Sequence, residues 1–294
     1  MRTRRVLAIG LALCAPATAS LAQDSSLVSS QSADRPLAAS ASPSDSGHVQ
    51  KTFFTRHDLL RTGIAAAVTG GVMVYDKKIA AWTQQPHVQG SQSLHNTVSD
   101  LTRLNETPLT IASVLTYGIG RLTKSQTTAD VGLHWTEALL LTDVISQAIR
   151  GPLGRARPRV SQDDPFKFQF GTGFTKFENR AFPSLHSAVG FATAAAIVGE
   201  LQLRKPDANW YAAPVLYSLA MVPGLTRMYL NQHWASDVVS GAFIGQLIGS
   251  RVVHYAHTHK RTKLDRALLA TSVMPNPYGG MLVTVSAQDL FGSR

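Results

Sequence analysis

The sequence predicts an all-α protein: a single helical bundle domain over residues 51–271, followed by a short irregular or strand-like C-terminal tail. Three observations support this fold class. From Phe53 onward the chain is a series of mostly apolar segments of helical length, rich in Ala, Leu and Val. No strand-like alternation of polar and apolar residues competes with them over that range. A domain of about 220 residues is also large enough to bury a substantial core.

The individual helices are expected where apolar residues recur at helical spacing between turn-like segments. In chain order, the expected segments are His57–Tyr75, Leu94–Leu104, Pro108–Leu122, Thr128–Ile149, Ser187–Leu201, Trp210–Pro223 and Trp234–His257. Residues 272–294 form the tail. In it, prolines and paired glycines precede the alternating run Met281–Val285, which predicts a turn and a short strand.

The first 22 residues have the pattern of a secretory signal peptide. Three arginines precede an apolar core from Val6 to Ala17, and Ser20-Leu21-Ala22 is a small-residue cleavage site. Residues 23–50, rich in Ser, Ala, Asp and Pro, predict a disordered linker. Cys14 is the single cysteine and lies inside the signal, so we expect an exported, periplasmic chain without disulfide or thiol chemistry.

The chain is basic, with a formal net charge of +10. Removal of the signal takes away three arginines and no acidic residue, which leaves +7. A basic exported protein suits anionic substrates or membrane surfaces. The sequence contains no aromatic-rich basic strand, zinc finger or recognition helix, so no nucleic-acid partner is expected.

The hydropathy pattern favours a periplasmic helical bundle that rests on the membrane. Most uncharged runs are shorter than the ~20 apolar residues that a span needs. The run 208–226 is long enough but contains Asn209, Pro214 and Pro223, and the mean hydropathy is +0.00. A multispan protein with short, tilted helices remains the alternative.

A first candidate site lies in the stretch Thr226–Asp237. If His233 opens a helix, Asp237 follows at i+4 on the same face. A carboxylate in that position can accept the Nδ1–H of the imidazole and leave Nε2 free as a nucleophile or base. Arg227 supplies a fork of donors that suits a tetrahedral oxyanion such as phosphate.

Two other stretches supply complementary groups. Pro183-Ser184-Leu185-His186 leads into a small-residue helical run, whose first turn would direct free backbone N–H groups at an anion. The loop 150–159 holds four arginines among Gly and Pro. It is either a solvated basic turn, a patch that faces anionic lipid, or a pair of arginines, Arg150 and Arg157, that bracket a phosphate.

Together the three stretches resemble the signature of the type 2 phosphatidic acid phosphatase family, which includes lipid phosphate phosphatases, acid phosphatases and vanadium haloperoxidases. The family pattern is Lys-x6-Arg-Pro, Pro-Ser-Gly-His and Ser-Arg-x5-His-x3-Asp. Order and spacing agree with it over about residues 131–253. Three positions depart from the pattern: Arg150 replaces Lys, Leu185 replaces Gly and Thr226 replaces Ser.

The resemblance implies a metal-independent phosphatase that acts through a phosphohistidine. By this resemblance His233 attacks phosphorus, Asp237 holds its ring, and His186 protonates the leaving oxygen and later activates water. The phosphate oxygens would be held by the remaining motif residues: Arg150, Arg157, Ser184, the backbone N–H at Leu185, and Arg227. No cofactor is expected, and vanadate should inhibit.

The leaving group stays open. A phosphorylated lipid or diphosphate is the expected substrate, since Pro-Ser-Leu-His resembles a lipid-acting variant. A non-specific periplasmic acid phosphatase for soluble esters and a vanadate-dependent haloperoxidase are the alternatives. The oligomeric state is not predicted.

The remaining histidines are interpreted as structural or polar-face residues. His254, His257 and His259 sit at the end of the last helix beside basic residues, where cations favour the helix C-terminus. Four other histidines have no partner at metal-ligand spacing in the sequence. They are His57, His87, His95 and His134.

Overall fold

The computed structural model describes residues 53–103 and 105–259, and the two strands 271–275 and 281–285. The predicted signal peptide, residues 1–22, and the predicted linker, residues 23–50, lie outside the described residues.

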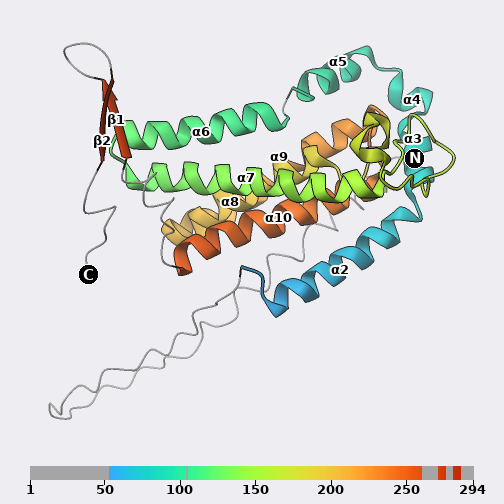
Figure 1. The fold of residues 1–294 in the computed structure, drawn as a ribbon. Coiled ribbons are helices and arrows are strands. Elements are labelled where there is room, and N and C mark those ends of the chain that lie inside the picture. The colour runs from blue at the N-terminus through green and yellow to red at the C-terminus, as the bar shows by residue number, and fades with distance from the viewer. Residues whose placement is uncertain (1–52, 104, 260–270, 276–280, 286–294) are drawn as a thin grey trace, which may run out of the picture. The chain divides into compact units, whose positions relative to one another are not determined.

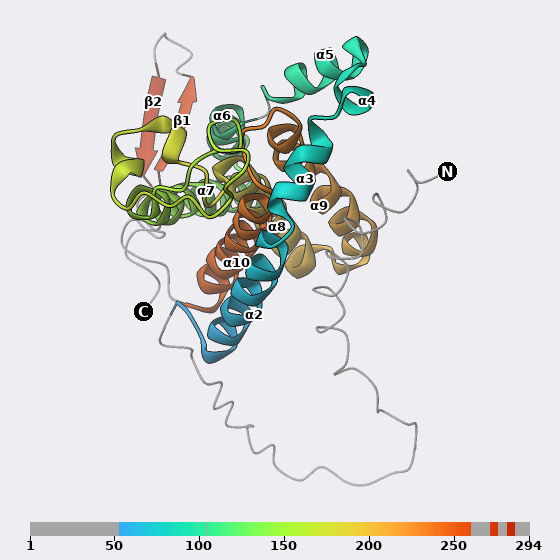
Figure 2. The same cartoon turned by 90° about the vertical axis from the view of Figure 1, so that its right-hand side faces the viewer.

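The domain is all-helical, as predicted. Figure 1 shows the long helices α6, α7, α8, α9 and α10 beside one another, with α3 to α5 following at one end. The turned view in Figure 2 shows α2 lying along α10. The helices are α2 (Arg56–Met73), α3 (Asp76–Thr83), α4 (Pro86–Gln89), α5 (Gln92–Leu101), α6 (Glu106–Leu122), α7 (Gln126–Leu153), α8 (Leu185–Arg204), α9 (Pro206–Tyr229) and α10 (Ala235–Thr258), with short 3-10 turns η1 (Thr172–Phe174) and η2 (Phe177–Asn179).

Two departures from the predicted helices matter for the site. Helix α9 continues through Pro214 and Pro223 to Tyr229, whereas the prediction ended it at the second proline. A proline inside a helix loses one backbone hydrogen bond, but packing against α8 outweighs that local cost here. Helix α3 was not predicted at all, because its short sequence lacks an extended apolar stripe.

Helix starts follow the capping residues that the sequence places there. Thr55 and Asp58 form a capping box at α2, in which each side chain accepts a hydrogen bond from the other residue's backbone N–H. The side chain of Asn105 caps α6, and that of Ser125 caps α7. At α8 the cap is Ser184, which fixes the start of that helix at the candidate site.

Small residues let α8 and α10 approach closely. A Cβ added at Gly241, Gly245 or Gly249 would lie only 2.0–2.6 Å from backbone oxygens of α8. These three glycines recur every four residues, so they form one stripe along α10. The stripe brings the first turns of the two helices together, and both turns carry candidate site residues. The main core lies between α7, α8 and α10, and its buried members are Trp135, Ala138, Leu139, Leu185, Val189, Ala192, Ala196, Ile248, Val252 and Val253.

The C-terminal strands form an antiparallel pair. Strand β1 (Thr271–Pro275) pairs with β2 (Met281–Val285), and Thr271 lies opposite Val285. Strand β2 coincides with the alternating run from which a strand was predicted, whereas β1 was not predicted.

Within the described residues, no helix is both long enough and apolar enough to cross a membrane.

Candidate active site

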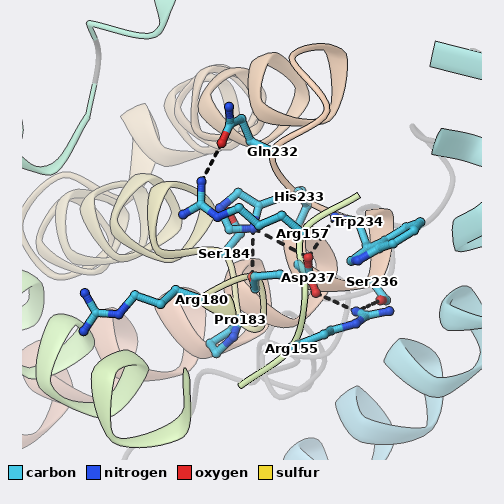
Figure 3. A network of polar contacts seen from close by, with 12 residues as sticks. Arg155, Arg157, Arg180, Pro183, Ser184, Gln232, His233, Trp234, Ser236 and Asp237 are labelled. Carbon is cyan, nitrogen blue, oxygen red and sulfur yellow. Dashed lines mark hydrogen bonds and ion pairs between the residues drawn. The ribbon is translucent and has the colours of Figure 1, made fainter. Parts of the chain in front are cut away.

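The structure brings the three predicted stretches together at one end of the helices (Figure 3). Arg150 lies in the last turn of α7, and the N–H of Ser184 at the start of α8 donates to the carbonyl of Asp237 in α10. Arg227 in the last turn of α9 donates to the ring of His186 in α8. The rings of His186 and His233 are 6.2 Å apart. Residues far apart in the sequence therefore surround one small volume.

His233 is buried and has one free ring nitrogen. Its Nδ1 lies 2.8 Å from the carbonyl oxygen of Ala181. Since a carbonyl can only accept, Nδ1 carries the hydrogen, and Nε2 keeps its lone pair. Burial lowers the pKa of His233, although Asp237 opposes that shift, so the ring is neutral at physiological pH. A neutral imidazole with Nε2 free is a competent nucleophile.

The partner of Nδ1 differs from the expected one. We expected Asp237 to accept this hydrogen, but its Oδ2 lies 3.6 Å from Nδ1, beyond a hydrogen bond. The Ala181 carbonyl is closer and orients the ring instead. Asp237 still places a carboxylate beside the ring, which stabilises positive charge that develops there.

Asp237 is held in turn by Arg155, a buried residue that the motifs did not single out. One Arg155 Nη donates to Asp237 Oδ1 at 2.5 Å, and the other donates to Asp76 Oδ2 at 2.8 Å. Ser236 donates its N–H and its hydroxyl to Asp76, at 2.9 and 2.5 Å. We call these four residues, Asp76, Arg155, Ser236 and Asp237, the floor of the site.

The two carboxylates of the floor differ in their pKa. Burial raises the pKa of Asp237, but the charge of Arg155 and the contact with His233 outweigh burial and leave its pKa below the usual range. For Asp76, burial is the stronger effect, and its pKa lies above the usual range despite Ser236 and Arg155. Asp237 therefore places an anionic carboxylate beside His233.

Three arginines above the floor keep part of their hydrogen-bonding capacity unused. Arg150 donates to the carbonyls of Arg180 and Pro183, and Arg157 donates to Gln232 Oε1 at 2.5 Å. Yet the Nε–H groups of Arg150, Arg157 and Arg227 are buried without a hydrogen-bond partner among the described residues. Buried donors normally find an acceptor, so the arrangement suits an anion.

His186 shares this environment. Because a guanidinium can only donate, the 2.7 Å contact with Arg227 makes Nε2 of His186 the acceptor, and the hydrogen sits on Nδ1. That Nδ1 is also buried without a partner in the described part of the chain. Burial, followed by the charges of Arg227 and then His233, lowers the pKa of His186 to about 2. We call Arg150, Arg157, Arg227 and His186 the mouth of the site.

Burial, together with neighbouring cations, lowers the pKa of two mouth arginines, Arg150 and Arg157. Burial lowers the pKa of Arg150 to about 10, and Arg180 adds to the effect. Burial likewise lowers the pKa of Arg157 to about 10, with further contributions from Arg159, Arg150 and Arg227. An anion bound among them would relieve this repulsion.

Ser184 and Leu185 have mainly structural side chains. Ser184 is fully buried, and its Oγ accepts from Ser187 N as the cap of α8. The Leu185 side chain belongs to the main core, so the substitution of Leu for the family's Gly does not direct a side chain at the pocket. Leu185 is the first helical residue, and its N–H therefore has no intrahelical acceptor.

Sequence reasoning missed four residues of the site: Asp76, Glu106, Arg155 and Gln232. Arg155 stood in the basic loop, but only its contacts with Asp76 and Asp237 distinguish it from the other arginines there. Asp76 belongs to a helix that was not predicted. Glu106 begins α6, and its Oε2 lies 3.6 Å from Nε2 of His186. An acidic residue after a capping Asn is ordinary at a helix start, so it gave no signal.

A helical protein that presents three arginines and two histidines to one small volume matches a known family. Residues 132–261, which contain all three motifs, match the model of the PAP2 superfamily, the family that the motifs indicated.

One curated protein and one solved structure are similar to this chain. The lipid A 1-phosphatase of Porphyromonas gingivalis is 29% identical over 163 residues, which cover 54% of this chain and 31% of that protein. The chain thus spans about a third of the length of that relative. A crystal structure of a transmembrane PAP2-type phosphatidylglycerolphosphate phosphatase from Bacillus subtilis is 21% identical, with a TM-score of 0.48; the alignment covers 69% of this chain and 96% of that one.

Proposed function

We propose that this protein is a metal-independent phosphatase that hydrolyses phosphate monoesters, with a phosphorylated lipid or diphosphate as substrate, through a phosphohistidine. The observation that carries the proposal is the set of buried N–H donors of the mouth without partners in the described chain, next to the free Nε2 of buried His233. Donors of this kind suit a phosphoryl group, and the imidazole is the nucleophile within reach.

Binding and rate acceleration use the same groups. The equatorial oxygens of the phosphoryl group accept hydrogen bonds from Arg150, Arg157 and Arg227 and from the N–H of Leu185. The positive end of the α8 helix dipole adds to the electrostatic attraction for the phosphoryl group. These donors are fixed before the substrate arrives, so they stabilise charge that builds up in the transition state without reorganisation.

The first step forms one bond and breaks one. His233 Nε2 attacks phosphorus, and the bond from phosphorus to the ester oxygen breaks. The substrate, bound as the phosphate monoanion, gives its proton to His186, which passes it to the leaving oxygen. The positive charge on the His233 ring is balanced by Asp237. In the second step water attacks phosphorus, gives a proton to His186, and the N–P bond breaks to release phosphate.

The surface beside the mouth supports a lipid substrate. The segment between α7 and α8 carries basic side chains and four exposed phenylalanines. These are Phe166, Phe170, Phe174 and Phe177. The ring of Phe177 lies 3.9 Å from the guanidinium carbon of Arg157. Apolar rings interleaved with cations suit an anionic membrane surface. We therefore place the exported protein on the periplasmic face of a membrane, with the acyl or isoprenyl tail against these rings.

The covalent step has a direct test. A substrate with radiolabelled phosphate, quenched during turnover, should label the wild-type chain through an acid-labile N–P bond. The His233→Ala variant should show neither label nor turnover, whereas His57→Ala, at an exposed histidine of α2, should show both. Turnover by purified His233→Ala would refute the assignment.

The substrate class and the rival activity are tested separately. Hydrolysis of phosphate monoesters of rising chain length, each below its micelle concentration, should show kcat/KM increasing with length, since burial contributes about 0.8 kcal/mol per methylene. The variant Phe170→Ser should flatten this series, and Leu59→Ser on α2 should not. Chelator should not stop turnover and vanadate should inhibit it; bromide oxidation that depends on vanadate would support the haloperoxidase instead.

A further inference from the structure

A second cluster of ionisable side chains lies at the opposite ends of the helices that carry the site. His134 in α7, Glu200 in α8 and His257 in α10 each offer one ligand atom, and these atoms all lie within 4.8 Å of one another. From the residue numbers and the 1.5 Å rise of a helix, the cluster lies about 20–30 Å along each helix from Arg150, His186 and Asp237. It therefore takes no part in the chemistry described above.

Both imidazoles converge on the same carboxylate oxygen. Glu200 Oε1 lies 2.5 Å from Nδ1 of His134 and 2.9 Å from Nε2 of His257. His134 and Glu200 are buried, while the His257 side chain is 30% exposed. Two imidazole nitrogens and one carboxylate oxygen, with a side open to solvent for water, form the donor set of a tetrahedral zinc site.

The rest of the cluster holds the carboxylate in place. Arg204 donates from Nε to the other oxygen, Glu200 Oε2, at 2.8 Å, and reaches Asp130 Oδ2 at 3.1 Å. Such outer contacts orient a ligating carboxylate. Two carboxylates face one guanidinium, and the imidazoles add no charge when neutral. With both imidazoles neutral, Glu200, Asp130 and Arg204 together carry a net negative charge, which favours a cation.

We propose that His134, Glu200 and His257 bind one zinc ion that ties α7, α8 and α10 together at the end remote from the mouth. On binding, each imidazole moves its ring proton to its other nitrogen and stays neutral, while Glu200 ligates through Oε1. Mixed nitrogen and oxygen ligands favour zinc over magnesium or calcium, which prefer oxygen ligands alone. The ion stabilises the bundle and leaves the phosphatase chemistry metal-independent.

Zinc titration of the purified full chain, freed of metal by chelator and without an affinity tag, tests the proposal. Calorimetry should show one tight zinc site per chain, with a rise in Tm, and neither effect with magnesium. His257→Gln should weaken this site by at least about 100-fold, since even outer-shell changes cost 10–100-fold. The control variant His254→Gln changes an exposed histidine of the same helix and should bind zinc as the wild type does.

A spectroscopic readout complements the binding data. X-ray absorption at the zinc edge of the loaded protein should show imidazole nitrogens at about 2.0–2.1 Å. Equal zinc affinity in the wild type and His257→Gln, or the absence of saturable zinc binding, would overturn the proposal; the cluster would then be an ion-pair network. Neither result affects the proposed phosphatase, whose turnover is measured in the metal-free protein.

Discussion

The floor and the mouth of the site both contain buried arginines, but they use them in opposite ways. In the floor, Arg155 is enclosed by acceptors: Asp76, Asp237, Ser236 and the carbonyl of Pro165 occupy all its donor nitrogens. In the mouth, Arg150, Arg157 and Arg227 each keep a buried Nε–H without a partner in the described chain. The hydrogen bonds of Arg155 are complete within the described chain, whereas the mouth arginines keep donors that the proposed phosphate substrate would use.

Arg155 and Arg157 lie only two residues apart in the basic loop, yet the first belongs to the floor and the second to the mouth. A buried guanidinium whose carboxylate partners are present contributes to the fold only while both partners remain. A buried guanidinium with unused donors costs free energy in the unliganded protein, and that cost is recovered when an anion binds. Substitutions in the floor should therefore lower the stability of the fold, and substitutions in the mouth should weaken phosphate binding and turnover.

The largest expected effect is the loss of the floor arginine. Arg155→Met leaves two buried carboxylates without their shared cation, which should lower the free energy of unfolding by about 3–5 kcal/mol. Denaturant unfolding measures this. Arg159→Met is the matched control, because Arg159 pairs with Glu178 at the surface and such pairs contribute about 1 kcal/mol or less.

If Arg155→Met is too unstable to purify, Arg155→Lys provides the measurement. A lysine keeps the charge but loses the fork that reaches both carboxylates, so its stability should be intermediate. Wild-type stability in either variant would mean that the floor does not support the fold.

Loss of a mouth arginine should have the opposite effect: it should lower the rate of hydrolysis and leave the stability nearly unchanged. Arg227→Met removes a fixed donor to the phosphoryl group, which should lower kcat/KM by about 10²–10³-fold. In the absence of phosphate its Tm should change little, because the variant loses one hydrogen bond to His186 but also removes a partly buried charge whose pKa is lowered by burial and whose Nε–H has no described partner. A fall in Tm parallel to the fall in rate would place Arg227 in the floor class instead.

Phosphate itself should distinguish the two regions. A ligand at 100 times its Kd adds about 2.7 kcal/mol of stability, which corresponds to about 5–10 °C in Tm for a domain of this size. Inorganic phosphate should produce this shift in the wild type and in Arg159→Met, at constant ionic strength. In Arg227→Met the shift should be much smaller; an equal shift would mean that phosphate binds elsewhere.

The sequence predicted the mouth much better than the floor. Spacing within three short motifs identified His186, His233 and the mouth arginines, because each motif lies at one helix end and its residues are close in sequence. The floor depends on Asp76 and Arg155, which are far apart in the chain and meet only after α3 packs on α10. Neither the close approach of α8 and α10 nor the pairing of Arg155 with two distant carboxylates can be obtained from periodicity alone.

The pH dependence of kcat/KM should reflect the low pKa of His186. A pKa of about 2 keeps this residue neutral in the free protein over the working range. The proton for the leaving group must then enter with the substrate as the phosphate monoanion, whose second pKa is about 6. The value of kcat/KM should thus fall tenfold per pH unit above about 6.

Two substrates can show which group causes the break in the pH profile, that is, the pH of about 6 above which kcat/KM begins to fall. An ester whose phosphate has a lower second pKa should move the break to lower pH by the same amount. A break that stays at one pH for both substrates would belong to an enzyme group, and His186 would then titrate in the free protein, contrary to its burial among cations.

The smallest expected effect concerns Glu106, the carboxylate at the edge of the mouth. Its charge raises the pKa of Arg227 and of Arg150, in each case against the lowering by burial, so it competes with a bound anion for these cations. Its side chain is 44% exposed, and solvent screening limits the interaction to about 1 kcal/mol or less. Glu106→Gln should therefore tighten inhibition by phosphate about two- to fivefold, and less at high salt.

Asp100→Asn on α5, at a surface pair with Arg103, is the control and should leave inhibition unchanged. The rate separates two roles for Glu106. As a competitor for the arginines, its loss leaves kcat near the wild-type value while the inhibition constant falls. If Glu106 instead orients His186 through their 3.6 Å contact, its loss lowers kcat most for alkyl esters, which need the proton, and least for aryl esters. The second outcome would move Glu106 from the edge of the mouth into the proton-transfer machinery.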